Sequence, residues 1–178
     1  MKKSANILIL VLCSAVFLLA AGCASTGNST IDQPFSVKLG QYKSAKVEVK
    51  STAANRPEKI DEFLEQLESR IIVKLRDMQT FEKIYSNADT DSHAELHIVV
   101  TITKIRDIDN YDRVMFGALA GQAKTTAMVE IKDEATGRLI GSGQIEGKSS
   151  NGTVLSGTTP QAVDRVADEV TNIIRKNL

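Results

Sequence analysis

The stretch "AELHIVVTITKIRDI", residues 94–108, decides the fold class of this chain. Successive side chains of an extended chain point to opposite sides, so a strand pattern repeats every two residues. One side of the stretch carries Leu96, Ile98, Val100 and Ile102. The other side carries His97, Val99, Thr101, Thr103 and Ile105. Because β-branched residues dominate and both sides hold apolar groups, the stretch predicts a central strand of a β-sheet.

A second β pattern follows in "KTTAMVEIKDEATGRLIGSGQIEGKSS", residues 124–150, which predicts a β-hairpin. Its alternating apolar residues are Ala127, Val129 and Ile131 on the first arm and Leu139 and Ile145 on the second. The connection "DEATGR" places Gly137 where a left-handed residue is needed to close the turn.

Shorter strands are predicted upstream of these elements. Val47 and Val49 alternate with charged residues and indicate a strand at about residues 45–50. Val37 and Leu39 suggest another short strand, and "TFEKIYS", residues 80–86, suggests a third. These segments would extend the sheet around the central strand.

The segment "NRPEKIDEFLEQLESRIIVKLRDMQ", residues 55–79, predicts an amphipathic helix. Asn55 and Glu58 match a capping box, and Pro57 falls in the first turn. The apolar face consists of Ile60, Phe63, Leu64, Leu67, Ile71, Leu75 and Met78. A helix that binds a membrane surface or a partner would have the same face, but packing on its own sheet is the simpler interpretation.

A second helix is predicted for "TTPQAVDRVADEVTNIIRKNL", residues 158–178. Thr158 and Gln161 match a capping box, and Pro160 falls in the first turn. The apolar face consists of Val163, Val166, Val170, Ile173 and Ile174. The order of elements predicts an α+β fold, with a mostly antiparallel sheet and both helices packed on one face.

The first 22 residues have the three parts of a secretory signal peptide. Lys2 and Lys3 are followed by an apolar run from Ile7 to about Leu19 and then by small residues. A membrane-spanning helix is the alternative, but Ser14 interrupts the apolar run and a small polar tract follows it. We therefore expect a signal peptide at residues 1–22, a flexible lipidated tether at residues 23–34 and a single domain at residues 35–178.

The sequence "LAAGC", residues 19–23, resembles the lipobox of bacterial lipoproteins. The resemblance implies cleavage between Gly22 and Cys23 and acylation of Cys23 with chains such as palmitate. Ala20 stands where leucine is commonest. The next residue is Ala24 rather than aspartate, which implies an outer-membrane anchor with the domain in the periplasm. Two or three acyl chains on one residue suffice for durable attachment.

The hairpin also carries a family resemblance. The pattern D-x-A-T-G-x-L-x-G is formed by Asp133, Ala135, Thr136, Gly137, Leu139 and Gly141, and it is followed by "GKSS". With the Gly/Ala-rich approach and the C-terminal helix, this pattern resembles the bacterial lipoprotein family called domain of unknown function 4410. The resemblance covers roughly residues 35–178 and implies no catalytic residues.

One row of residues has metal-ligand chemistry. In "DTDSHAELH", residues 89–97, acidic and histidine residues alternate, and His93, Glu95 and His97 are the weak candidates for a divalent metal site. A solvated loop that enters a strand explains the same row, so we expect no metal and no cofactor. The acidic run "RDIDNYD", with Asp107, Asp109 and Asp112, predicts a surface turn, and Gly117 and Gly121 in "FGALAG" predict a close approach or loop.

Composition narrows the functional class. The 22 basic and 22 acidic residues balance, and the 4% aromatic content is low, so nucleic acid is not an expected partner. Loss of Lys2 and Lys3 would leave the mature chain with a net charge of −2 and no expected attraction to anionic surfaces. Cys13 lies in the signal peptide and Cys23 would be lipidated, so no thiol remains for catalysis.

The sequence contains no recognised hydrolase, nucleotide-binding or zinc-protease motif. We therefore expect a lipid-anchored, non-catalytic binding or assembly module of the cell envelope rather than an enzyme. It would contact the membrane through its N-terminal lipid, and an envelope protein or another copy of itself as a partner. A small-ligand or glycan-binding module and an unrecognised hydrolase are the alternatives.

Overall fold

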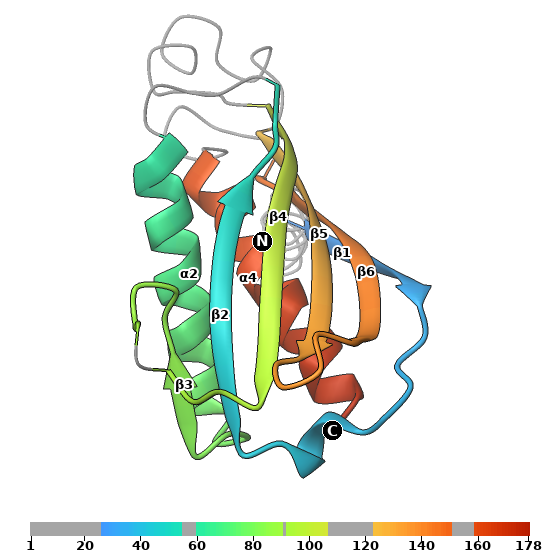
Figure 1. Cartoon of the computed structure of the whole chain (residues 1–178). Coiled ribbons are helices and arrows are strands. Elements are labelled where there is room, and N and C mark those ends of the chain that lie inside the picture. Colours follow the sequence, from blue (N-terminus) through green and yellow to red (C-terminus); the bar gives the residue numbers. More distant parts are fainter. Residues whose placement is uncertain (1–25, 55–59, 91, 107–122, 151–158) are drawn as a thin grey trace, which may run out of the picture.

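The computed structural model describes residues 26–54, 60–90, 92–106, 123–150 and 159–178. Its elements are β1 (Thr26–Gln33), the 3₁₀ turn η1 (Leu39–Gln41), β2 (Ser44–Ser51), α2 (Ile60–Asp77), β3 (Lys83–Tyr85), β4 (Leu96–Arg106), β5 (Lys124–Asp133), β6 (Leu139–Lys148) and α4 (Thr159–Lys176). The strands form one sheet in the order β1-β6-β5-β4-β2-β3 (Figure 1).

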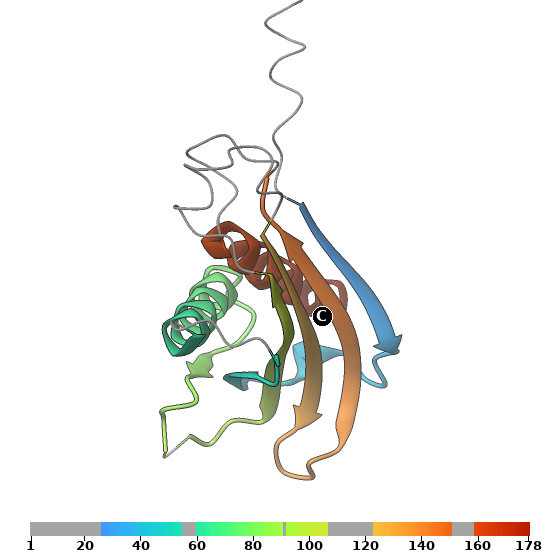
Figure 2. The same ribbon diagram turned by 90° about the horizontal axis from the view of Figure 1, so that it is seen from above.

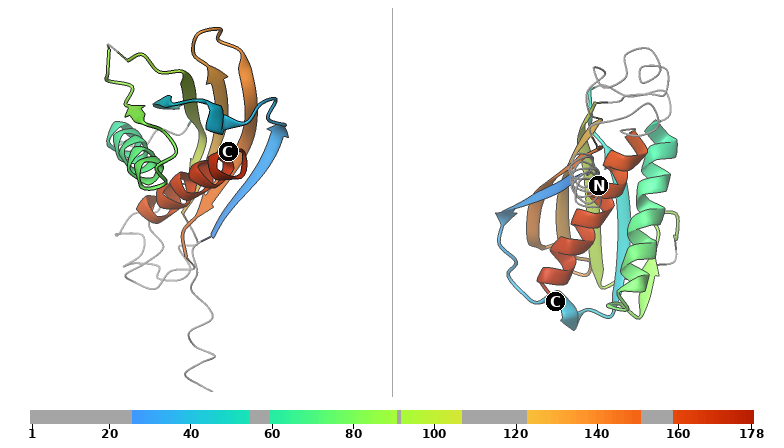
Figure 3. Two further views of the ribbon diagram at one scale, coloured as in Figure 1. Left: turned by 90° about the horizontal axis from the view of Figure 1, so that it is seen from below. Right: turned by 180° about the vertical axis from the view of Figure 1, so that it is seen from behind.

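The sheet is mixed and mostly antiparallel. β4, β5, β6 and β1 form successive antiparallel pairs, whereas β2 runs parallel to both β4 and β3. Both helices cover the same face of the sheet, as Figure 2 and Figure 3 show. The predicted α+β fold is therefore confirmed.

The core lies between this face and the helices. Its fully buried side chains include Ala45, Val47, Leu67, Ile71, Leu75, Leu96, Ile98, Val100, Ile102, Ala127, Ile131, Ile145, Val166, Val170 and Ile174. The apolar faces predicted for the two helices supply one side of this core. Phe63, Leu64 and Met78 of the first helix are only partly buried at its rim. Asn55, Pro57, Glu58 and Thr158 lie outside the described residues.

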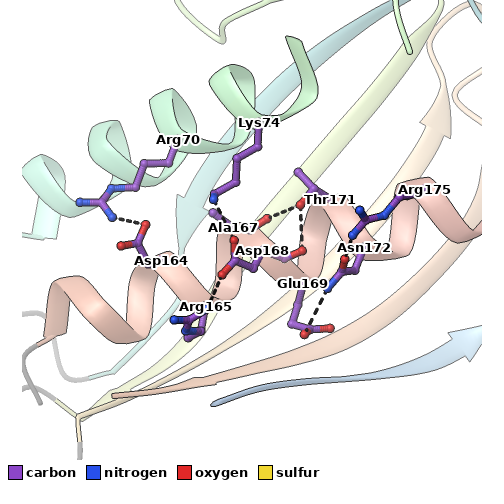
Figure 4. A network of polar contacts seen from close by, with 10 residues as sticks. All are labelled: Arg70, Lys74, Asp164, Arg165, Ala167, Asp168, Glu169, Thr171, Asn172 and Arg175. Atoms are coloured by element: carbon purple, nitrogen blue, oxygen red, sulfur yellow. Dashed lines mark hydrogen bonds and ion pairs between the residues drawn. The ribbon is translucent and has the colours of Figure 1, made fainter. Parts of the chain in front are cut away.

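Ion pairs join the exposed sides of the two helices (Figure 4). The Arg70 guanidinium contacts the Asp164 carboxylate, and Lys74 Nζ lies 2.8 Å from Asp168 Oδ1. Asp168 also accepts a 2.8 Å contact from Arg165. These side chains are about one-third to one-half exposed, so the pairs add little stability beyond the core contacts.

β4 is the central strand that the alternation predicted, but its pattern changes near its end. Ile102 pairs with Ala127 and Lys104 pairs with Thr126, so Thr103 is an extra residue in a β-bulge. The bulge turns Ile105 onto the helix-covered face, where it joins the core. The prediction that Ile105 shares a side with His97 is wrong because a strict two-residue period cannot continue through a bulge.

Two N-terminal predictions are also wrong. Residues 26–33 are not flexible tether but β1, which pairs with β6 from Thr26↔Lys148 to Gln33↔Ser142. Within the residues that the structure describes, the folded part therefore begins at Thr26, not at residue 35. Leu39 forms no strand: it starts the η1 turn, its side chain is fully buried in the core, and its backbone N–H donates to Asn177 O (2.8 Å).

In the described part of the chain, neither helix combines the length and the apolar character that crossing a bilayer requires. The predicted signal peptide, Gly22 and Cys23 lie outside that part.

Candidate functional site

The sheet has one face that no described helix covers, and Figure 1 is seen from this side. We call it the open face. Its side chains alternate with those of the core and include Lys46 and Glu48 of β2, His97, Val99 and Thr101 of β4, Thr126, Met128 and Glu130 of β5, and Gln144 and Glu146 of β6. Apart from Val99 and Met128 these side chains are polar, as expected for a surface in contact with water or a polar partner.

Ion pairs connect the charged groups of the open face. Glu48 Oε1 lies 3.0 Å from Lys50 Nζ, and Glu146 contacts both Lys124 and Lys148. Burial alone would raise the pKa of Glu48, but the hydrogen bond and charge of Lys50, together with the neighbouring His97, outweigh burial and lower the pKa. Hydrogen bonds from Lys124 and Lys148 lower the pKa of Glu146. These carboxylates are thus held as anions, which is unsuitable for a general acid.

His97 lies between two carboxylates at the start of β4, at the end of this surface nearest the β5–β6 turn. Its Nε2 is 3.0 Å from Glu48 Oε2, without regular hydrogen-bond geometry, and its Nδ1 is 3.2 Å from Glu134 Oε2. The two carboxylates lie at opposite nitrogens of the ring. One ion could therefore not be bound by all three groups.

The structure does not bring His93 and Glu95 to His97. Glu95 precedes β4 and its Oε2 accepts the Lys43 backbone N–H at 2.6 Å, while the His93 carbonyl accepts the Ser44 hydroxyl at 3.3 Å. Asp89 caps a turn at Ser86. Across the ranges that the structure describes, no three His, Cys, Asp or Glu side chains converge as metal ligands would. The other motifs, Asp107, Asp109, Asp112, Gly117 and Gly121, lie outside those ranges.

The hairpin motif closes a turn. Asp133 Oδ1 accepts both the Thr136 backbone N–H (2.9 Å) and the Thr136 hydroxyl (2.7 Å), and Gly137 has the left-handed φ of 67° that was predicted. The Thr136 hydroxyl and N–H lower the pKa of Asp133. Burial raises the pKa of Tyr42, whose hydroxyl donates to Asp133 at 3.3 Å. The D-x-A-T-G pattern is therefore explained by turn formation.

β1 is the second feature with functional potential. It is an eight-residue strand at the end of the sheet, with β6 on one side and no described strand on the other. Most of its side chains are exposed, including Ile31 at 47%. On the helix side, the Ser29 hydroxyl donates to Glu169 Oε2 at 2.9 Å. An exposed edge of this length is a template for pairing with another chain.

A shallow depression of about 580 Å³ lies on the open face where β4 ends and β5 begins. Its charged lining consists of Lys104, Arg106, Lys124 and Glu146. Sequence reasoning missed it, because it depends on the pairing of strands that are distant in the chain. It is open to solvent and three of its four charged groups are cations, unlike the enclosed pockets of most small-molecule sites.

These features describe an α+β domain with a charged open face and an uncovered edge strand. The chain belongs to the family described as domain of unknown function (DUF4410), whose model matches residues 33–163. This confirms the family resemblance that the hairpin motif indicated. No curated protein matches the chain.

Among solved structures, the chain is similar to two of the PelC dodecamer from Paraburkholderia phytofirmans, with TM-scores of 0.51 and 0.50 and 15% sequence identity in both. The matches cover 80% of this chain and 93% and 94% of the PelC chains. A Xanthomonas campestris protein of the DUF330 family is similar over 82% of this chain and 84% of its own, with a TM-score of 0.45 and 7% identity. The PelC likeness shows a shared fold.

Proposed function

We propose that this chain is a lipid-anchored, non-catalytic assembly module of the cell envelope that forms homo-oligomers through β1. The observation that carries the proposal is the uncovered edge of β1, which begins only three residues after Cys23. An anchor at Cys23 would confine copies to one membrane surface and raise their local concentration. Weak pairing at the strand edge would then suffice for assembly.

Three further observations support the proposal. The sequence "LAAGC" resembles a lipobox, and Ala24 favours the outer membrane with the domain in the periplasm. The solved PelC structures of the same fold are dodecamers, which supports homo-oligomers here. The carboxylates of the open face are committed to ion pairs with neighbouring cations, which supports a binding role over catalysis.

The anchor is tested with the native protein and a Cys23→Ser variant, compared by intact mass and membrane fractionation. We expect the native protein to begin at an acylated Cys23 and to fractionate with the outer membrane. The variant should keep the mass of an unacylated chain. Equal mass and equal fractionation of the two proteins would contradict the lipid anchor.

The assembly surface is tested with an Asn28→Lys/Thr30→Lys variant, because lysines on an edge strand oppose strand addition. Both positions are exposed on β1. The matched control is Thr90→Lys/Ala135→Lys, which adds the same charge at exposed sites elsewhere. By native mass spectrometry from detergent, we expect oligomers for the wild type and the control and monomers for the β1 variant. A monomeric wild type, or a β1 variant that still assembles, would refute this surface.

A further inference from the structure

The open face carries a row of three cations in direct register. Arg106 of β4 pairs with Lys124 of β5, and Lys124 pairs with Lys148 of β6. We call Arg106, Lys124 and Lys148 the cationic rung. Like charges directly opposite each other on neighbouring strands destabilise a sheet. An anion bound close to the three cations would therefore reduce their mutual repulsion.

Among the described residues, the nearby negative charge balances the positive charge of the cationic rung only in part. Glu146 contacts Lys124 and Lys148, which leaves one carboxylate for two lysines. Arg106 and the adjacent Lys104 are exposed, and within the described ranges neither forms an ion pair or a side-chain hydrogen bond. The depression and the cationic rung together hold four cations and one carboxylate.

The cationic rung lies at the end of the sheet nearest the predicted anchor. Thr26, the first residue of β1, pairs with Lys148 and therefore continues the same row. Thr26 lies three positions after Cys23, and a fully extended chain over that distance spans about 10 Å. An acylated Cys23 would thus hold Lys148 within about one or two Debye lengths of the lipid headgroups.

We propose that the cationic rung docks on the leaflet that holds the Cys23 lipid and binds the phosphate groups of anionic headgroups. This inference rests on the proposed lipid anchor. The net charge of −2 expected for the mature chain does not oppose it, because the described residues of this corner carry four cations and one carboxylate. Contact at both Cys23 and the rung would fix the tilt of the sheet, so that the β1 edges of neighbouring copies face one another.

The test uses the lipidated full chain reconstituted in vesicles of phosphatidylcholine, with or without phosphatidylglycerol. A fluorophore on Gln144→Cys reports on the open face near the depression, and one on Ala135→Cys reports on the hairpin turn at the opposite end. Lipids with a spin-labelled headgroup quench a fluorophore that lies at the membrane surface. We expect stronger quenching at position 144 when phosphatidylglycerol is present, and little quenching at position 135 in either vesicle.

The decisive comparison is between two variants that lose the same charge. Lys124→Gln/Lys148→Gln removes two cations of the rung, whereas Lys38→Gln/Lys83→Gln removes two exposed cations elsewhere. A lysine near an anionic surface contributes about a fivefold effect, so the loss of two lysines should lower the docked-to-undocked ratio roughly 25-fold. The control variant should dock like the wild type, and circular dichroism verifies that both are folded.

Three outcomes would overturn the inference: equal quenching in the two kinds of vesicle, no effect of the rung variant, or displacement by inorganic phosphate, which would indicate a soluble anion as the ligand. Intact mass of the same preparation separates this inference from the proposed function. Without acylation at Cys23, the anchor itself fails. With acylation but no dependence on phosphatidylglycerol, only the docking of the rung fails.

Discussion

Replacement of Gly147 by alanine tests the contact between β6 and α4 on which the fold depends. A Cβ atom at Gly147 would lie 2.2 Å from the Ala162 carbonyl oxygen, where ordinary contacts begin at 3.4 Å. It would also lie 3.0 Å from Val166 Cγ2. The closest atom belongs to the backbone of a helix, so the overlap cannot be relieved by a change of rotamer. The helix must move by about 1 Å, which loosens the contacts of the fully buried Val166.

Overpacking of a core costs about 1–3 kcal/mol, and a backbone clash belongs at the upper end. We therefore expect Gly147→Ala to lower the free energy of unfolding by about 3 kcal/mol and the melting temperature by about 6–12 °C. Urea unfolding and calorimetry measure both quantities. The control is Gly40→Ala, whose Cβ would meet nothing closer than 3.6 Å and which should leave stability unchanged within about 1 kcal/mol. A Gly147→Ala protein as stable as the control would refute the close packing of β6 on α4.

Three smaller predictions follow from the core and its polar contacts. Ile98→Ala should lower the free energy of unfolding in urea by about 2–5 kcal/mol, because Ile98 is fully buried; a loss below 1 kcal/mol would contradict its place in the core. A double-mutant cycle on Lys74 and Asp168 should give a coupling of about 0.5 kcal/mol that salt weakens, because both side chains are about one-third exposed; coupling that is insensitive to salt would argue against this pair. Hydrogen bonds from Thr136 lower the pKa of Asp133 below its ordinary 3.8, so its contribution to stability is present above that pH and is lost as the pH falls through the folded value. Asp133→Asn should therefore lose less stability than the wild type when urea unfolding is followed from neutral pH to below 3.8, and equal losses would refute the turn contact.

The elements with a strong local pattern could be predicted from the sequence. The alternation from Leu96 to Ile102 identified the central strand, because the helix-covered face of β4 selects apolar residues at every second position. Ile105 could not be placed in the same way, because the bulge at Thr103 arises from pairing with β5 rather than from the residues of β4. β1, "TGNSTIDQ", has the composition of a linker, and only its partner strand makes it a strand.

The candidate site was less predictable than the fold, because it depends on strand register. His97 was identified as a polar group with binding chemistry, but its contacts Glu48 and Glu134 lie far from it in the sequence. The predicted row of metal-ligand candidates does not form at Glu95. This residue lies before β4 begins, and its side chain turns toward the start of β2. The cationic rung has no local signature, since its members come from three strands.

The pairing of β1 with β6 also determines when the sheet can be completed. Thr26 leaves the ribosome long before its partner Lys148 does. β1 must therefore remain unpaired while most of the domain is synthesised, and this long-range contact should form among the last. Until then the edge of β6 is exposed to other chains. A chaperone that holds unfolded chains would have its largest effect on this final step of folding.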